Sequence, residues 1–259
     1  MKRCITWPCT STSPEPVDSP VSDLPLLEVL RLGIRSHQET WELQQELLAK
    51  RAAEEISDTL ILVEHESLIT VGRGGDLQAV RSAGLPVVEV ERGGEATYHG
   101  PGQVVAYPIL ALPEGQRDLH RHLGMLEEVI IRVLGEFDIT GERKQGLTGV
   151  WIGEQKVASV GVAVRQWVTW YGFALNVHTD LEKFAGFQPC GLDPKVMTRV
   201  ADHVQLPPAT ILFEVLIVKH MLEVFGRRLP DPPPLDPGSE SGGTCSPGPS
   251  GFPSLPIIP

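Results

Sequence analysis

Hydrophobic residues along the middle of the chain follow two patterns, short apolar runs and longer stripes with helical spacing. A run of about four to ten mostly apolar residues is typical of a strand covered by other parts of the protein. Such runs predict strands at 26–32, 58–64, 68–71, 87–90, 103–110, 148–152, 156–165 and 167–177. The last two runs are separated by a single residue, so we expect them to form a hairpin.

Apolar positions three and four residues apart predict helices. The clearest stripe consists of Leu119, Leu123, Leu126, Ile130, Val133 and Phe137. Another helix is expected after Ser36, because Glu39 three residues later completes a capping-box pattern. A short helix over 77–83 and a closing helix over 209–225 complete the set. Because strands and helices are mixed without strict alternation, we expect the α+β class, with a mixed, largely antiparallel sheet backed by helices.

The two ends of the chain lack this patterning. Residues 1–24 carry Ser, Thr and Pro without periodicity, and residues 230–259 contain 10 Pro, 5 Gly and 5 Ser. Segments of such composition cannot bury enough apolar surface to form a core. We therefore predict a loose N-terminal extension at 1–24, one catalytic domain at 25–229 and a disordered tail at 230–259.

Composition excludes several classes of protein. A chain of 259 residues is long enough to bury a core without a disulfide framework. It contains no apolar run of the roughly 18 to 20 residues that span a bilayer. No apolar stretch follows Lys2 and Arg3, so we expect no targeting signal, a cytoplasmic location and no membrane partner. A formal net charge of -11 is opposite in sign to that of a general nucleic-acid binder.

The segment Arg92–Gln103 (RGGEATYHGPGQ) has four glycines between two apolar runs. We expect a loop here, in which glycine allows a ligand to approach the backbone and N–H groups cradle it. A turn-rich connector without a ligand is the alternative. The segment matches neither the phosphate-binding loop nor the dinucleotide-binding glycine pattern.

Two further residues are candidates for chemistry. Alternation along a strand would place Lys156 on one face with Ala158, Val160, Val162 and Val164. Its ammonium is then either buried on the core face or exposed to solvent, because the long lysine side chain can extend to the surface. Cys190, between Pro189 and Gly191, is expected on an irregular, tightly turned backbone, which suits a nucleophile better than a structural cysteine. The Gly191 N–H is then a candidate oxyanion donor, and an inert buried cysteine is the alternative. No Cys or His has partners at zinc-ligand spacing, so no metal site is expected.

Four segments resemble, in the same order, the signature blocks of the lipoyl(octanoyl) transferase family. They are RGGEATYHGPGQ from Arg92, GVWIGEQKVASVGVAV from Gly149, WYGFALNVHTDL from Trp170 and PCGL from Pro189. Weaker similarity begins near Leu26 and includes the LILVEH and TVGR segments. The resemblance therefore extends over most of the predicted domain.

The resemblance implies octanoyl-[acyl carrier protein]:protein N-octanoyltransferase activity. It also implies the fold of the catalytic domains of biotin and lipoate protein ligases. In this family a cysteine at the position of Cys190 carries the acyl group as a thioester, and a lysine at the position of Lys156 stabilises its thiolate. The implied substrate-binding positions are Arg92, Gly93, Gly94, Glu95, Ala96, Thr97, Tyr98, His99, Ser159, Val160, Gly161, Gly172, Phe173 and Ala174.

The implied reaction is the first step of endogenous protein lipoylation. An octanoyl group passes from octanoyl-acyl carrier protein to a lysine of lipoyl domains, those of 2-oxoacid dehydrogenase complexes and of the glycine cleavage H protein. A thioester is already activated, so neither ATP nor any other cofactor or metal is expected. We expect space for the octanoyl chain beside small residues, namely Ala158, Gly161, Gly172 and Ala174. Carrier proteins and lipoyl domains are typically acidic, as is this chain, so a local basic patch must attract them. The candidates for this patch are Arg117, Arg121, Arg143 and Lys144.

Three other functions stay open. An ATP-dependent lipoate or biotin protein ligase would share the fold and release pyrophosphate. A cysteine thioesterase would release free octanoate without an acceptor domain. A non-catalytic module that binds acyl chains or carrier protein would tolerate the loss of Cys190.

Overall fold

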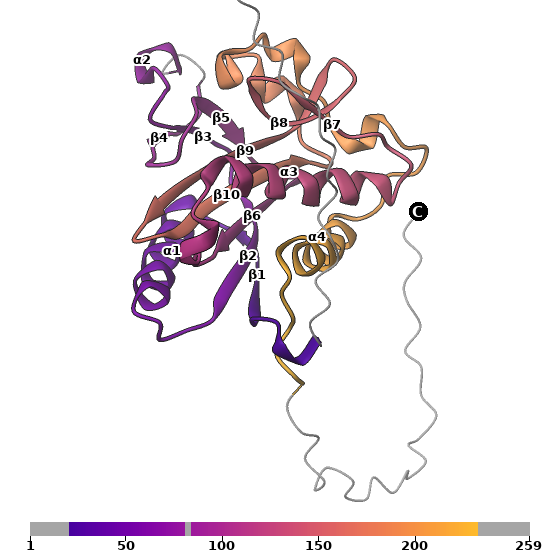
Figure 1. Cartoon of the computed structure of the whole chain (residues 1–259). Helices are drawn as coiled ribbons and strands as arrows, with labels where there is room; N and C mark the ends of the chain where they lie inside the picture. Colours follow the sequence, from indigo (N-terminus) through magenta and orange to yellow (C-terminus); the bar gives the residue numbers. More distant parts are fainter. Residues whose placement is uncertain (1–20, 81–83, 233–259) are drawn as a thin grey trace, which may run out of the picture.

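The computed structural model describes residues 21–80 and 84–232. The N-terminal extension predicted at 1–24 and the tail predicted at 230–259 lie outside the described residues, apart from 21–24 and 230–232. The described residues form two β-sheets and four α-helices, joined by loops and short 3-10 turns (Figure 1).

The larger sheet has seven strands in the order β1-β2-β6-β10-β9-β8-β7. These strands are β1 (Leu27–Arg35), β2 (Asp58–His65), β6 (Gln103–Ile109), β7 (Glu142–Lys144), β8 (Leu147–Ile152), β9 (Gln155–Arg165) and β10 (Val168–Asn176). β1 and β2 are parallel, and the other neighbours in this sheet are antiparallel. In the smaller sheet, β3 (Leu68–Val71) lies between β4 (Val87–Glu89) and β5 (Ala96–His99). The predicted α+β class with a mixed, largely antiparallel sheet is confirmed.

Helices cover both faces of the larger sheet (Figure 1). α3 (Leu119–Gly135) and α4 (Thr210–Phe225) pack on one face, in a core that includes Leu60 of β2. α1 (His37–Ala52) packs on the other face, in a core that includes the next residue, Ile61. Successive residues of a strand point to opposite faces, so the continuous apolar run of β2 supplies both cores.

The predicted elements appear with their ends shifted by a few residues. The Ser36 cap is also confirmed, because its hydroxyl accepts from the Glu39 N–H while the Glu39 carboxylate accepts from the Ser36 N–H. The helix predicted over 77–83 is α2 (Leu77–Val80), and residues 81–83 lie outside the described part. No helix within the described ranges is long and apolar enough to cross a bilayer.

The sequence analysis is wrong at two strands. β5 lies inside the segment expected to be a loop, and all four of its residues are buried. Polar Thr97 and His99 alternate with apolar Ala96 and Tyr98, so no apolar run marks this strand. β7 is a strand of three residues at the edge of the sheet, and most of it is exposed, so hydrophobicity does not reveal it either.

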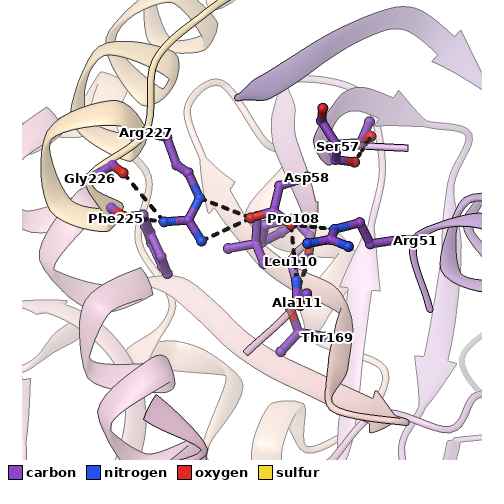
Figure 2. Close-up of polar contacts among 11 residues, drawn as sticks. Arg51, Ser57, Asp58, Pro108, Leu110, Ala111, Thr169, Phe225, Gly226 and Arg227 are labelled. Carbon is purple, nitrogen blue, oxygen red and sulfur yellow. Dashed lines mark hydrogen bonds and ion pairs between the residues drawn. The ribbon is translucent and has the colours of Figure 1, made fainter. Parts of the chain in front are cut away.

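A buried carboxylate joins three distant parts of the chain (Figure 2). Asp58, at the start of β2, is 3% exposed and accepts hydrogen bonds from Arg51 Nε at 2.7 Å and from Arg227 Nε at 2.9 Å. The Ala111 N–H donates to it as well, at 3.1 Å. A buried charge is tolerated when it is paired and hydrogen-bonded in this way. The network ties the end of α1 and the segment after α4 to the central sheet.

Candidate active site

One cavity of about 180 Å³ is lined by strands of both sheets. The structure brings most of the predicted site residues to it: Lys156, Cys190, Arg92, Gly94, Glu95, Thr97, His99, Ser159, Val160, Gly161, Gly172, Phe173 and Ala174. Gly93, Ala96 and Tyr98 do not line it. Ala96 and Tyr98 belong to the opposite face of β5, where they pack in the core of the smaller sheet. The alternation of β5 therefore divides the predicted segment between cavity and core.

Lys156 is buried, with 2% of its surface exposed, so its stem does not carry the ammonium to water. Its Nζ donates to the Thr148 carbonyl at 2.8 Å and lies 5.8 Å from the centroid of the Trp151 ring. Within residues 21–80 and 84–232, no carboxylate forms an ion pair with it. The positive charge is thus held by a carbonyl and an aromatic ring, and it is available to an anion in the cavity.

The predicted strand face of Lys156 is wrong because β9 contains a bulge. Val150 pairs with Ala158 but Trp151 pairs with Lys156, so Val157 is an extra residue in the ladder. An extra residue reverses the alternation beyond it. Val157 and Ala158 consequently both pack in the core, whereas Lys156 points into the cavity. Ser159, Val160 and Gly161 line the same cavity.

Gly149 in β8 makes the position of the lysine possible. A Cβ at Gly149 would lie 2.5 Å from the Ala158 carbonyl oxygen, 2.6 Å from Cε of Lys156 and 3.2 Å from its Nζ, so this glycine admits both the neighbouring backbone and the lysine side chain. The residue has a φ of +128°, which strongly favours glycine. Its N–H donates to the Glu127 carboxylate at 2.8 Å, which fixes this part of β8.

Cys190 lies on a 3-10 turn, Pro189–Gly191, and has left-handed backbone angles, φ 53° and ψ 34°. The predicted irregular backbone is confirmed, and strain of this kind concentrates at functional sites. Its Sγ lies 3.9 Å from Ser159 Oγ, and the residue is half-buried. The expectation for Gly191 is wrong, because the turn directs its N–H to the Gln188 carbonyl at 3.2 Å.

Arg92 fixes the wall of the cavity next to Cys190. Its guanidinium donates to the Thr70 carbonyl at 3.1 Å, to the Thr70 hydroxyl at 2.9 Å and to the Gly93 carbonyl at 3.0 Å. Burial lowers the pKa of Arg92, and the negative charge of a Cys190 thiolate opposes that shift. The arginine therefore contributes a second positive charge near the sulfur.

Three of the four small residues that were expected beside the octanoyl chain line the cavity. A Cβ at Gly161 would lie 3.0 Å from the Gly93 carbonyl oxygen, and one at Gly172 would collide with the Ala106 carbonyl oxygen. The missing side chains of these two glycines therefore let neighbouring backbone approach, and both glycines also line the cavity. Ala158 packs in the core, whereas Gly161, Gly172 and Ala174 lie beside the free space of the cavity, as predicted. The apolar lining of the cavity comes from Val105, Leu147, Val160, Phe173, Ala174 and Leu192.

Comparison with known proteins supports the same assignment. The profile of the lipoyl protein ligase A/B catalytic domain matches residues 36–221. The octanoyltransferase of Gloeobacter violaceus is 44% identical over 200 residues, which cover 75% of this chain and 88% of that protein. The chain belongs to the octanoyltransferase family. It is an acyltransferase, as the resemblance in sequence implies.

The fold of this octanoyltransferase is also similar to that of solved protein ligase structures. A chain from the structure of a bipartite lipoate protein ligase and its E2 lipoyl domain from Thermoplasma acidophilum superposes with a TM-score of 0.62. The sequence identity is 16%, and the match covers 80% of this chain and 87% of that one. Biotin protein ligase from Aquifex aeolicus, in complex with biotin and ATP, superposes with a TM-score of 0.50. Its sequence identity is 15%, and the match covers 78% of this chain and 70% of that one. These likenesses confirm the predicted ligase-type fold.

One wall of the octanoyltransferase cavity is polar, and sequence patterns did not reveal most of it. His37, at the start of α1, and Tyr107 and Tyr171 all line the cavity. The predicted His99 joins them, and its ring nitrogens contact Gln103 Oε1 at 2.8 Å and Thr70 Oγ1 at 3.2 Å. Burial lowers the pKa of both histidines, so both are neutral at pH 7. His37, Tyr107 and Tyr171 come from a helix start or from apolar runs, where no local pattern distinguishes a cavity residue from a core residue.

The predicted basic patch is partly neutralised. Arg143 forms ion pairs with Glu128 at 2.8 Å and Glu127 at 3.3 Å, and Lys144 pairs with Glu154 at 2.7 Å. The other two candidates, Arg117 and Arg121, are exposed. Neither forms an ion pair with a described residue, so they are the stronger candidates for attracting an acidic partner.

Proposed function

We propose that this octanoyltransferase transfers an octanoyl group from octanoyl-acyl carrier protein to a lysine of lipoyl domains, through a thioester on Cys190. The observation that carries the proposal is the shared cavity. It holds a half-buried cysteine on a strained turn together with a buried lysine that no carboxylate neutralises within the described residues. A cysteine activated by nearby positive charge is the arrangement expected of a thiolate nucleophile.

In the first half-reaction, the Cys190 thiolate attacks the thioester carbonyl carbon of the acylated carrier. The carrier thiol leaves, and the octanoyl group stays on Cys190. Lys156 and Arg92 stabilise the anionic sulfur before attack. Gly94 lines the cavity, and its N–H has no hydrogen-bond partner among the described residues. We assign it as a donor to the developing oxyanion, in place of the Gly191 N–H.

In the second half-reaction, a lysine amine attacks the octanoyl-Cys190 carbonyl carbon. As the amide forms, the carbon–sulfur bond breaks, the amine nitrogen releases a proton to water, and Cys190 leaves as a thiolate. Lys156 stabilises that thiolate again. The energy of the thioester drives both steps, so the proposal requires neither ATP nor a metal.

The test is a single-turnover reaction of the protein with octanoyl-acyl carrier protein, followed by intact mass spectrometry. We expect one octanoyl group on Cys190, and its transfer to a lysine when a lipoyl domain is added. Cys190→Ala is expected to lose both steps while the circular-dichroism spectrum stays unchanged. An octanoyl group on another residue, or full transfer by Cys190→Ala, would refute the assignment.

The same reaction distinguishes the alternatives. Pyrophosphate release from ATP and free octanoate would indicate a ligase. Release of octanoate without a lipoyl domain would indicate a thioesterase, and carrier binding without any acylation would indicate a binding module.

The partners follow from the proposed reaction. The acyl donor is the octanoylated carrier protein, and the acceptors are lipoyl domains of 2-oxoacid dehydrogenase complexes and of the glycine cleavage H protein. Arg117 and Arg121 are the proposed docking charges, and reversing both is expected to weaken carrier binding at low salt. Unchanged affinity would dismiss this surface. The cytoplasmic location expected from the sequence stays a prediction.

A further inference from the structure

A carboxylate lies directly beside the turn that carries the nucleophile. Glu95 precedes β5 and lines the cavity that also contains Cys190 and Lys156. Its carboxylate carbon would be 3.1 Å from a Cβ at Gly191, the residue after Cys190. The missing side chain at Gly191 is therefore what allows the carboxylate to sit there, and the φ of +69° favours glycine as well.

This carboxylate has no partner within residues 21–80 and 84–232. No hydrogen bond or ion pair joins it to a described side chain or backbone group. The two cations of the same cavity are bonded elsewhere, Arg92 to Thr70 and Gly93, and Lys156 to Thr148. Glu95 is half-buried, so a group entering the cavity can reach it.

A negative charge at this place does not help the first half-reaction. It repels the Cys190 thiolate, whose stabilisation depends on Lys156 and Arg92. The second half-reaction has the opposite requirement, because its nucleophile arrives as a cation. A lysine side chain in water has a pKa of about 10.4, so at neutral pH it is an ammonium without a lone pair for attack. It must be bound and deprotonated next to the thioester.

We propose that Glu95 binds the ammonium group of the acceptor lysine beside octanoyl-Cys190 and accepts one proton from it. This inference rests on the proposed function. Ammonium and carboxylate form a charge-assisted hydrogen bond, which orients the nitrogen toward the thioester. The neutral amine then forms a bond to the carbonyl carbon, and the bond from that carbon to Sγ breaks. The second proton of the amine passes to the departing sulfur or to water as the amide forms.

The test separates the two half-reactions in wild type and Glu95→Gln. We expect acylation of Cys190 by octanoyl-acyl carrier protein to be at least as fast in the variant, because a like charge near the thiolate is removed. We expect transfer from preformed octanoyl-Cys190 to a lipoyl domain to slow on the order of 100-fold, the lower end of what a general base supplies. Glu66→Gln, an exposed residue without a contact to the cavity, is the matched control and is expected to behave as wild type.

A second nucleophile shows whether Glu95 acts on the acceptor lysine or only holds Cys190 in position. Hydroxylamine is mostly neutral at pH 7 and needs no base to expose its lone pair. We expect it to remove the octanoyl group from wild type and Glu95→Gln at the same rate. If Glu95→Gln slowed the reactions with hydroxylamine and with lysine equally, the inference would be overturned and Glu95 would be a positioning residue for Cys190. If transfer to lysine were unchanged in Glu95→Gln, the inference would be overturned outright. Failure of wild type to form octanoyl-Cys190 would instead refute the proposed function, and this inference with it.

Discussion

The position of the Lys156 ammonium depends on a glycine that makes no chemical contribution of its own. In Gly149→Ala the new Cβ would lie 2.6 Å from Cε of Lys156 and 2.5 Å from the backbone carbonyl oxygen of Ala158 in β9. Carbon atoms pack at about 3.5 to 4.0 Å, so Cε must retreat by about 1 Å or more. A displacement of about 1 Å in a catalytic arrangement can cost about 100-fold in rate. We therefore expect Cys190 acylation to slow about 100-fold, although no catalytic group has been removed.

The substitution also strains the backbone. Alanine at a φ of +128° costs on the order of 1 to 3 kcal/mol of unfolding free energy. Gly153→Ala is the matched control, since its φ is +55° and a Cβ there would meet nothing within 4 Å. Gly153→Ala therefore carries a left-handed strain of about 1 to 2 kcal/mol without a clash with Lys156 or with the Ala158 carbonyl, so Gly149→Ala is expected to lose more stability than this control.

The assay combines a stability measurement with a rate. Urea unfolding measures the free energy of unfolding of each variant. Quenched time courses with octanoyl-acyl carrier protein measure the rate at which the folded protein is acylated on Cys190. We expect both variants to lose stability and only Gly149→Ala to lose rate. If the folded Gly149→Ala protein were acylated at the wild-type rate, the position of the Lys156 ammonium would not control the reaction.

Two further predictions concern stability. Asp58→Ala leaves Arg51 and Arg227 without their carboxylate, so the unfolding free energy should fall by about 3 to 5 kcal/mol in urea titrations; a loss below 1 kcal/mol would mean that solvent replaces the carboxylate. Burial lowers the pKa of His122 from 6.5 to about 4, so the unfolded chain takes up a proton at a higher pH than the native protein. Stability is therefore lost as the pH falls from 6.5 toward 4, by about 2 kcal/mol at pH 5 relative to pH 8. His122→Leu should remove that part of the pH dependence, and an unchanged pH profile would contradict the assignment.

Local sequence was sufficient for the elements whose signals lie within a few residues of one another. The stripe of α3, the Ser36 cap and the apolar runs of β2 and β6 depend on periodicity and short-range hydrogen bonds. The irregular turn at Cys190 follows from its Pro and Gly neighbours for the same reason. The order of the four family-like blocks was enough to single out Cys190 and Lys156, 34 residues apart, and the structure places both in one cavity.

The tertiary structure decided which way those side chains point and what surrounds them. A single extra residue, Val157, turns Lys156 from the core face to the cavity, and a bulge is a property of two paired strands that one strand does not encode. The roles of Gly149 and Gly191 depend on atoms from Lys156 and Glu95, which are distant along the chain or in separate strands. Periodicity reports how far a residue is from water, whereas a reactive site depends on which charges meet inside the fold. That second property arises only when the strands are paired.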